Sequence, residues 1–221
     1  MRFLIDTANI DDIKEIYEMG VLGGVTTNPT IIAREGKEFK TAIKDICNNT
    51  PDDAMVFAEV LSLKADEMVE EAKDLAKIDK KMVIKIPMCI EGLKAVSKLS
   101  KLGIKTTVTI IFSATQALMA ARAGATFVAS FVGRHDDVGQ DGIDYLSDIV
   151  DIFNVNGIET KIIAASVRTQ VHVLQCARLG IDYATIPASV FKAMSKHPFT
   201  DKALEGFLKD WADLQAKLST K

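Results

Sequence analysis

Cysteine and histidine are scarce in this chain, and their scarcity argues against two kinds of site. The only cysteines are Cys47, Cys89 and Cys176, an odd number without CxxC spacing. We therefore expect reduced thiols in a cytoplasmic protein and no disulfide framework. The three histidines are scattered, without the spacing of metal ligands. No metal site is expected from this pattern.

An excess of charge of either sign is also missing. The formal net charge is -3, from 27 basic and 30 acidic residues spread along the chain. A nucleic-acid-binding protein needs a basic face, so we expect no nucleic-acid partner. No apolar run approaches the roughly 20 residues of a membrane span, so we expect no membrane partner. The opening MRFLIDTAN enters strand-like sequence at once, so we expect no signal peptide.

Short β-rich runs alternate with longer helical stretches along the whole chain. Hydrophobic residues make up 48% of the 221 residues, enough for a sizeable core. The strand candidates lie about 20 to 30 residues apart, and each is followed by a helical stretch. They are RFLID (2–6), GGVTTN (23–28), MVFAEV (55–60), MVIKIP (82–87), IKTTVTII (104–111), TFVASFVG (126–133), KIIAAS (161–166) and DYATIP (182–187).

This alternation predicts an α/β protein with a parallel sheet. Eight strand–helix units in one chain indicate a single (β/α)8 TIM barrel that spans residues 1–221. No G-x-G-x-x-G follows the first strand, and its absence weakens the alternative of a doubly wound dinucleotide-binding fold. An extra helix, about residues 199–218, carries an apolar stripe that a closed barrel does not require. It packs either on its own barrel or on a neighbouring subunit, and the sequence leaves both open. The stripe consists of Phe207, Leu208, Trp211, Leu214 and Leu218.

The strand VIKIP contains a lysine where an apolar residue would be expected. Alternate side chains of a barrel strand point inward and outward. Ile84 and Ile86 suit the helix side, so Lys85 should point into the barrel. The same alternation pairs Leu4 with Asp6, Thr26 with Asn28, Phe57 with Glu59, Thr107 with Thr109, Ala129 with Phe131, and Ala164 with Ser166. Barrel enzymes place their chemistry at the carboxyl ends of the strands, where these polar residues should form one pocket.

Two interpretations of Lys85 are open. Burial disfavours a charged amine, and a free amine attacks carbonyls to form a Schiff base. Two nearby carboxylates could then carry protons, one during Schiff-base formation and one during cleavage of a C–C bond. Alternatively, Asp6 or Glu59 neutralises Lys85 in an inert ion pair, which is a costly way to fill a core. Asn28 and Thr109 suit sugar hydroxyls or a held water, although each alone could be a solvated rim residue.

Two arginines follow the sixth and seventh strands. Arg134 and Arg168, together with Ser166, could bind a phosphate, because guanidinium groups match phosphate oxygens. The loop after the seventh strand of a barrel often has this role. A solvated surface arginine is the alternative for each. The nearby run His135 to Asp137 suggests a solvated loop rather than a metal site.

Several motifs resemble the small-subunit transaldolase family, which includes the fructose-6-phosphate aldolases. The resemblance runs in the expected order from residue 3 to about residue 211. It rests on FLIDTANIDDIKE, GVTTNPTII, FAEV, VIKIPM, GIKTTVTIIF, FVGR followed by DDVG, and AASVRT. It implies a (β/α)8 class I aldolase without metal or organic cofactor. It also implies rings of five subunits, often paired into decamers, in which the C-terminal helix reaches a neighbour.

The resemblance also implies a role for each site residue. Lys85 matches the Schiff-base lysine and Asp6 the acid/base of C–C cleavage. Glu59 would carry protons through a water held by Thr109, and Asn28 would bind a substrate hydroxyl. The phosphate-binding positions correspond to Arg134, Ser166 and Arg168, and the remaining substrate-binding candidates are Thr26, Thr107 and Phe131.

Two of these positions divide the family. The aldolases have glutamine where this chain has Glu59 and tyrosine where it has Phe131, whereas transaldolases have glutamate and phenylalanine. The resemblance therefore implies a transaldolase of the non-oxidative pentose phosphate pathway that acts on sugar phosphates. A dihydroxyacetone aldolase is the nearest alternative, and a non-catalytic sugar-phosphate-binding protein is a remote one. Many transaldolases have asparagine in place of Thr107, which leaves substrate affinity open.

Overall fold

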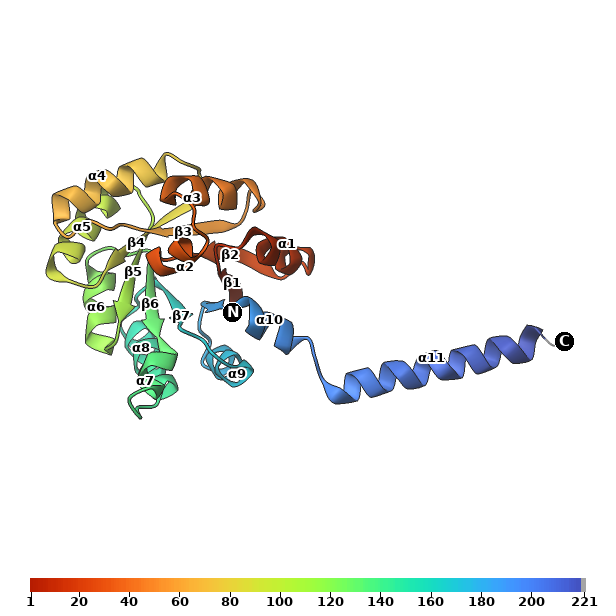
Figure 1. The fold of residues 1–221 in the computed structure, drawn as a ribbon. Helices are drawn as coiled ribbons and strands as arrows, with labels where there is room; N and C mark the ends of the chain where they lie inside the picture. The colour runs from red at the N-terminus through yellow and green to blue at the C-terminus, as the bar shows by residue number, and fades with distance from the viewer. Residues whose placement is uncertain (220–221) are drawn as a thin grey trace.

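The computed structural model describes residues 1–219 and contains a closed barrel of parallel strands (Figure 1). Each strand pairs with the next along the chain, and the last pairs with the first. The (β/α)8 barrel predicted from the sequence is confirmed. Its strands are β1 (Arg2–Asp6), β2 (Leu22–Thr26), β3 (Met55–Glu59), β4 (Met82–Pro87), β5 (Thr106–Ile111), β6 (Phe127–Phe131), β7 (Lys161–Ala165) and β8 (Tyr183–Ile186).

Helices follow the strands, and short polar side chains mark where several of them begin. Asn9, Ser113 and Thr169 each accept hydrogen bonds from backbone amides of the first turn, which satisfies groups that the helix itself leaves unpaired. The helices are α1 (Ile10–Glu18), α2 (Pro29–Arg34), α3 (Phe39–Asn48), α4 (Ala65–Ala76), α5 (Ile90–Lys101), α6 (Ala114–Arg122), α7 (Val132–Asp136), α8 (Gly142–Val155), α9 (Gln170–Arg178), α10 (Ala188–Met194) and α11 (Pro198–Ser219).

Two hydrophobic cores result from the alternation along the strands. The larger lies between the strands and the surrounding helices, and the smaller fills the barrel with residues that include Leu4, Phe57 and Val83. The seventh strand corrects the sequence-based assignment, because Ala165 faces inward whereas Ala164 packs against the helices. The error came from extending the strand through Ser166, whose backbone is left-handed with φ of 56°.

Helix α11 projects away from the barrel as a single rod (Figure 1). None of its described residues is buried, and Phe207 and Trp211 are 69% and 61% exposed. The helix therefore does not pack on its own barrel. No helix within residues 1–219 is both long enough and apolar enough to cross a bilayer.

Candidate active site

Lys85 points into the barrel from β4, as the alternation predicts. The residue is only 8% exposed. Its Nζ donates a hydrogen bond to the carbonyl oxygen of Thr27 at 2.6 Å and lies 3.1 Å from Oε2 of Glu59. Glu59 is its register partner on β3, so the strand pairing itself brings the two side chains together. The amine therefore has a carboxylate within proton-transfer distance.

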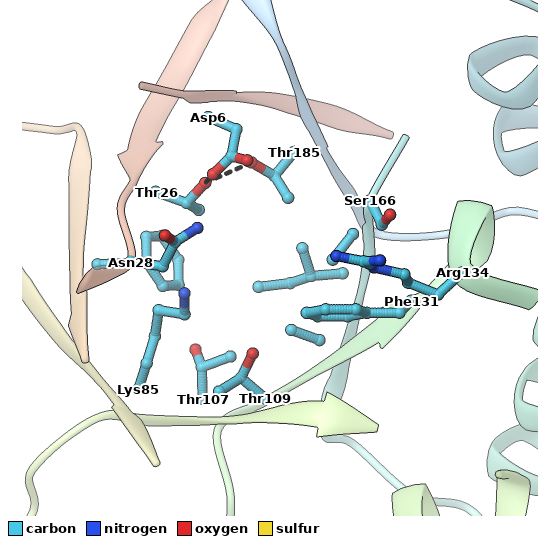
Figure 2. Close-up of a pocket in the computed structure, with 14 residues that line it drawn as sticks. Asp6, Thr26, Asn28, Lys85, Thr107, Thr109, Phe131, Arg134, Ser166 and Thr185 are labelled. Carbon is cyan, nitrogen blue, oxygen red and sulfur yellow. Dashed lines mark hydrogen bonds between the residues drawn. The ribbon is translucent and has the colours of Figure 1, made fainter. Parts of the chain in front are cut away.

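A cavity of about 210 Å³ opens in front of Lys85 at the carboxyl end of the barrel. Figure 2 shows Lys85 and Phe131 on opposite sides of this space, with Asp6 at one edge and Thr107 and Thr109 at another. The predicted site residues that line it are Asp6, Thr26, Asn28, Lys85, Thr107, Thr109, Phe131, Arg134 and Ser166. Glu59 lines a wider outer space instead, which also borders Asp6 and Lys85.

Asp6 lies at the carboxyl end of β1 and is held by a chain of hydroxyl groups. Thr26 Oγ1 donates to Asp6 Oδ1 at 2.8 Å and lies 2.5 Å from Thr185 Oγ1. Burial raises the pKa of the Asp6 carboxyl above its ordinary value, while the Thr26 hydrogen bond and the charge of Lys85 act in the opposite direction. A carboxyl with a raised pKa can release and recover a proton nearer to neutral pH.

The fifth strand supplies two hydroxyl groups to the cavity. Thr107 and Thr109 are each 1% exposed. Within residues 1–219, Thr107 Oγ1 is buried without a hydrogen-bond partner. An unpaired buried hydroxyl is costly, so a ligand hydroxyl or a water would stabilise it. The strand then bulges at Ile110, whose left-handed φ of 62° turns its side chain toward the outer space.

The three candidate phosphate ligands are not all at the cavity. Arg134 of α7 and Ser166 line it, whereas Arg168 does not. Both terminal nitrogens of Arg168 bind the carboxylate of Asp137, with Nη2 2.6 Å from Oδ2, and this contact lowers the pKa of Asp137. Gly133 lets α7 lie close to Ser166 and Arg168, because a Cβ at Gly133 would lie 2.5 Å from the carbonyl oxygen of Ser166 and 2.7 Å from Nε of Arg168.

The run that follows Arg134 is only partly the solvated loop that the sequence suggested, because Asp136 and Asp137 are exposed but His135 is buried. His135 lies within α7 and is 9% exposed. Its ring lies 4.3 Å from that of Tyr145, and its Nδ1 is 3.0 Å from Gln140 Oε1. The rings of Tyr145 on α8 and of Phe112 pack against the imidazole, which the sequence of the run alone does not reveal.

Two contributors to the site were missed in the sequence. The carbonyl of Thr27 is a backbone acceptor, and no residue type indicates which carbonyl a lysine will reach. Thr185 had a usable signal, because alternation along β8 places Tyr183 and Thr185 on the inward face. Both now border the barrel interior, Tyr183 in the inner core and Thr185 at the cavity.

Comparisons with known proteins identify one family that matches nearly the whole chain. The sequence profile of the Transaldolase/Fructose-6-phosphate aldolase family matches residues 3–219. A probable transaldolase of Clostridium tetani is 58% identical over 214 residues, which are 97% of this chain and 99% of the relative. A probable transaldolase of Clostridioides difficile is 57% identical over 218 residues, 99% of this chain and 100% of the relative.

Solved structures that resemble the chain show the fold alone. A mutant flavocytochrome b2 with benzoylformate superposes with a TM-score of 0.60 at 13% identity, covering 85% of this chain and 57% of that chain. A designed cube-shaped protein cage superposes with a TM-score of 0.61 at 15% identity, covering 99% and 81%. Identities this low carry no inference about activity.

Proposed function

The chain belongs to the transaldolase/fructose-6-phosphate aldolase family, and we propose that it acts as a transaldolase. It transfers a dihydroxyacetone unit from sedoheptulose 7-phosphate or fructose 6-phosphate to glyceraldehyde 3-phosphate or erythrose 4-phosphate. The observation that carries the proposal is the buried amine of Lys85, which faces a polar cavity and has a carboxylate 3.1 Å away. The names of the relatives support the transaldolase branch.

The Lys85–Glu59 pair suits the first step. Transfer of one proton from the ammonium of Lys85 to the carboxylate of Glu59, 3.1 Å away, gives the free amine that the reaction needs. The free amine then attacks the C2 ketone and forms a carbinolamine. Glu59, with a water held by Thr109, returns the proton to the departing hydroxyl, which leaves as water and gives the Schiff base.

Asp6 is suited to the second step. Its carboxylate takes the proton of the C4 hydroxyl while the C3–C4 bond breaks, and the electron pair moves into the protonated Schiff base to form an enamine. The aldehyde phosphate leaves. Addition of the enamine to a second aldose reverses these steps, with Asp6 returning the proton to the new hydroxyl. Asn28 and Thr107 supply hydrogen bonds to the sugar hydroxyls.

Glu59 and Phe131 favour transfer over simple aldol cleavage. Phe131 offers the cavity an apolar ring, which packs edge-on against Phe112 at 5.4 Å. Phe131 has no phenolic hydroxyl that could position a water to release dihydroxyacetone, so the three-carbon unit waits for an acceptor. A dihydroxyacetone aldolase that uses the same lysine is the alternative function.

The phosphate group and the quaternary structure belong to the same proposal. Arg134 and Ser166 border the cavity opposite Lys85, and Arg168 joins them if Asp137 releases it. The exposed apolar stripe of α11 packs on a neighbouring subunit in a homo-pentamer or homo-decamer. The proposed setting is the cytoplasm and the non-oxidative pentose phosphate pathway.

An acceptor-dependence assay tests the proposed activity. Purified protein is given fructose 6-phosphate with and without erythrose 4-phosphate, and the release of glyceraldehyde 3-phosphate is followed. A transaldolase releases product at a sustained rate only when the acceptor is present. Equal sustained rates without the acceptor would identify the aldolase instead, and a variant lacking the amine, Lys85→Ala, should be inactive in both assays.

A further inference from the structure

We propose that Thr185 is a positioning residue for Asp6, and that its hydroxyl acts through Thr26 to keep the Asp6 carboxyl ionised and correctly oriented. The inference rests on the proposed role of Asp6 in C–C bond cleavage and adds a residue to it. Thr185 does not need to touch the reacting atoms for this role.

The barrel brings the three side chains together from consecutive strands. The strand of Asp6, β1, lies between β2 and β8 in the closed sheet. Asp6 pairs in register with Thr26. Thr185 pairs with Leu4, which lies two residues before Asp6 on the same face of β1. Figure 2 shows the three polar groups at one edge of the cavity, joined by two hydrogen bonds. Thr26 and Thr185 are 5% and 6% exposed, so bulk water competes little for these bonds.

The number of hydroxyl protons fixes the direction in which the two hydrogen bonds run. A threonine hydroxyl has one proton to donate. Thr26 gives its proton to Asp6 Oδ1, so the proton in the Thr26–Thr185 contact must come from Thr185. The hydrogen bonds therefore run from Thr185 through Thr26 to the carboxylate of Asp6. Hydrogen bonds in series polarise one another, which strengthens the final donor to Asp6.

These two hydrogen bonds oppose the main effect of the surroundings on Asp6, which is the rise in its pKa caused by burial. Burial disfavours the charged carboxylate, and the Thr26 hydrogen bond is one of the contributions that favour it. Within residues 1–219, the side chain of Thr185 makes no hydrogen bond other than the one to Thr26. A threonine with packing as its only role would need no such bond, and valine would fill the same volume.

Thr185→Val removes the hydroxyl at nearly constant volume, and Thr185→Ser keeps it. Loss of one neutral hydrogen bond should lower kcat by about 2- to 10-fold. The acidic limb of the kcat/KM profile should move to higher pH by about half a unit, and Thr185→Ser should restore both values. Thr106→Val is the matched control, because Thr106 is a buried barrel threonine whose hydroxyl has no partner within residues 1–219. It should change neither value.

Two further readouts separate this inference from the proposed function. Borohydride trapping of dihydroxyacetone on Lys85 tests the function and should succeed equally in wild type and Thr185→Val. The titration of the Asp6 carboxyl, followed by ¹³C NMR in the full-length protein, tests the inference whether or not the enzyme is a transaldolase. An upward shift of the Asp6 pKa in Thr185→Val supports the inference. An unchanged Asp6 titration, or a rate loss that Thr185→Ser does not restore, overturns it.

Discussion

Two buried lysines, one just before the fourth strand and one within it, have different surroundings. Lys81 precedes β4 and Lys85 lies within it, and each is 8% exposed. Lys81 Nζ donates to the carbonyl oxygen of Cys47 in the last turn of α3, at 2.5 Å, and to that of Thr50 just beyond the helix, at 3.0 Å. A cation favours this position because the carbonyls at the end of a helix are otherwise unpaired.

Burial alone therefore does not mark a catalytic lysine. What distinguishes Lys85 is the cavity of about 210 Å³ beside it and a carboxylate 3.1 Å from its Nζ. The carboxylate nearest to Lys81, that of Asp79, lies farther away at 3.7 Å. The amine of Lys81 is held by backbone carbonyls. The amine of Lys85 has space beside it for a carbonyl compound and a carboxylate, that of Glu59, which can take its proton.

Removal of the amine at the cavity should have the largest effect. Lys85→Met keeps the apolar stem but removes the nucleophile, so transaldolase activity should fall by about 10⁴-fold or more. Cooperative thermal unfolding should persist, because the change leaves only two described groups without their lysine partner, the Thr27 carbonyl and the Glu59 carboxylate at the open end of the barrel. The coupled assay with fructose 6-phosphate and erythrose 4-phosphate measures the loss. Substantial residual activity would mean that another group performs the reaction.

Asp6→Asn should reduce activity by about 10³-fold, because the amide cannot take the hydroxyl proton. It should also stabilise the protein at pH 8. The folded-state pKa of Asp6 is raised, so the ionised carboxyl destabilises the fold at pH 8. The penalty decreases as pH falls through the raised pKa and is gone below the ordinary one. Thermal melts should therefore show a higher melting temperature for Asp6→Asn than for wild type at pH 8, and the two melting temperatures should converge at acid pH. Equal stability of the two proteins at pH 8 would contradict the raised pKa.

Glu59→Gln sharpens the comparison by removing the proton acceptor beside Lys85 while keeping its shape. Schiff-base formation should slow by about 100-fold, since general acid–base catalysis contributes effects of this order. Rapid quenching with borohydride measures that step directly. If only the cleavage step slows, the proton carrier has been assigned to the wrong carboxylate.

Lys81→Met should have the opposite pattern to Lys85→Met. The carbonyls of Cys47 and Thr50 would lose a buried donor, which should destabilise the fold by about 1–3 kcal/mol. The kcat should stay within about twofold of wild type at a temperature well below the melting point, because Lys81 does not line the cavity. Urea unfolding and the coupled assay give the two numbers.

The barrel and the direction of Lys85 were predictable, because both follow from periodicity. Strand–helix alternation repeats along the chain, and a period of two along VIKIP decides which face Lys85 occupies. Ser166 was predicted to reach the pocket for the wrong reason. Its left-handed backbone, not regular alternation, brings it there, and no residue preference indicates such a turn at a serine.

Long side chains and backbone acceptors were the least predictable parts. Arg168 was expected at the phosphate site, but Asp137 binds it outside the cavity. Sequence spacing places the Cα of an arginine, not the end of a flexible chain that can reach several partners. The acceptors of Lys81 and Lys85 are likewise backbone carbonyls, at the end of α3 and just after β2, and no residue type indicates which carbonyl a lysine will reach.

Chemical trapping of the amine tests the central claim most directly. The protein is incubated with fructose 6-phosphate, reduced with borohydride and digested, and the modified peptide is identified by mass spectrometry. The account predicts a reduced three-carbon adduct on Lys85 and none on Lys81, although both amines are buried to the same extent. Undiminished turnover without an adduct on Lys85, or an adduct on another lysine that accounts for turnover, would contradict it.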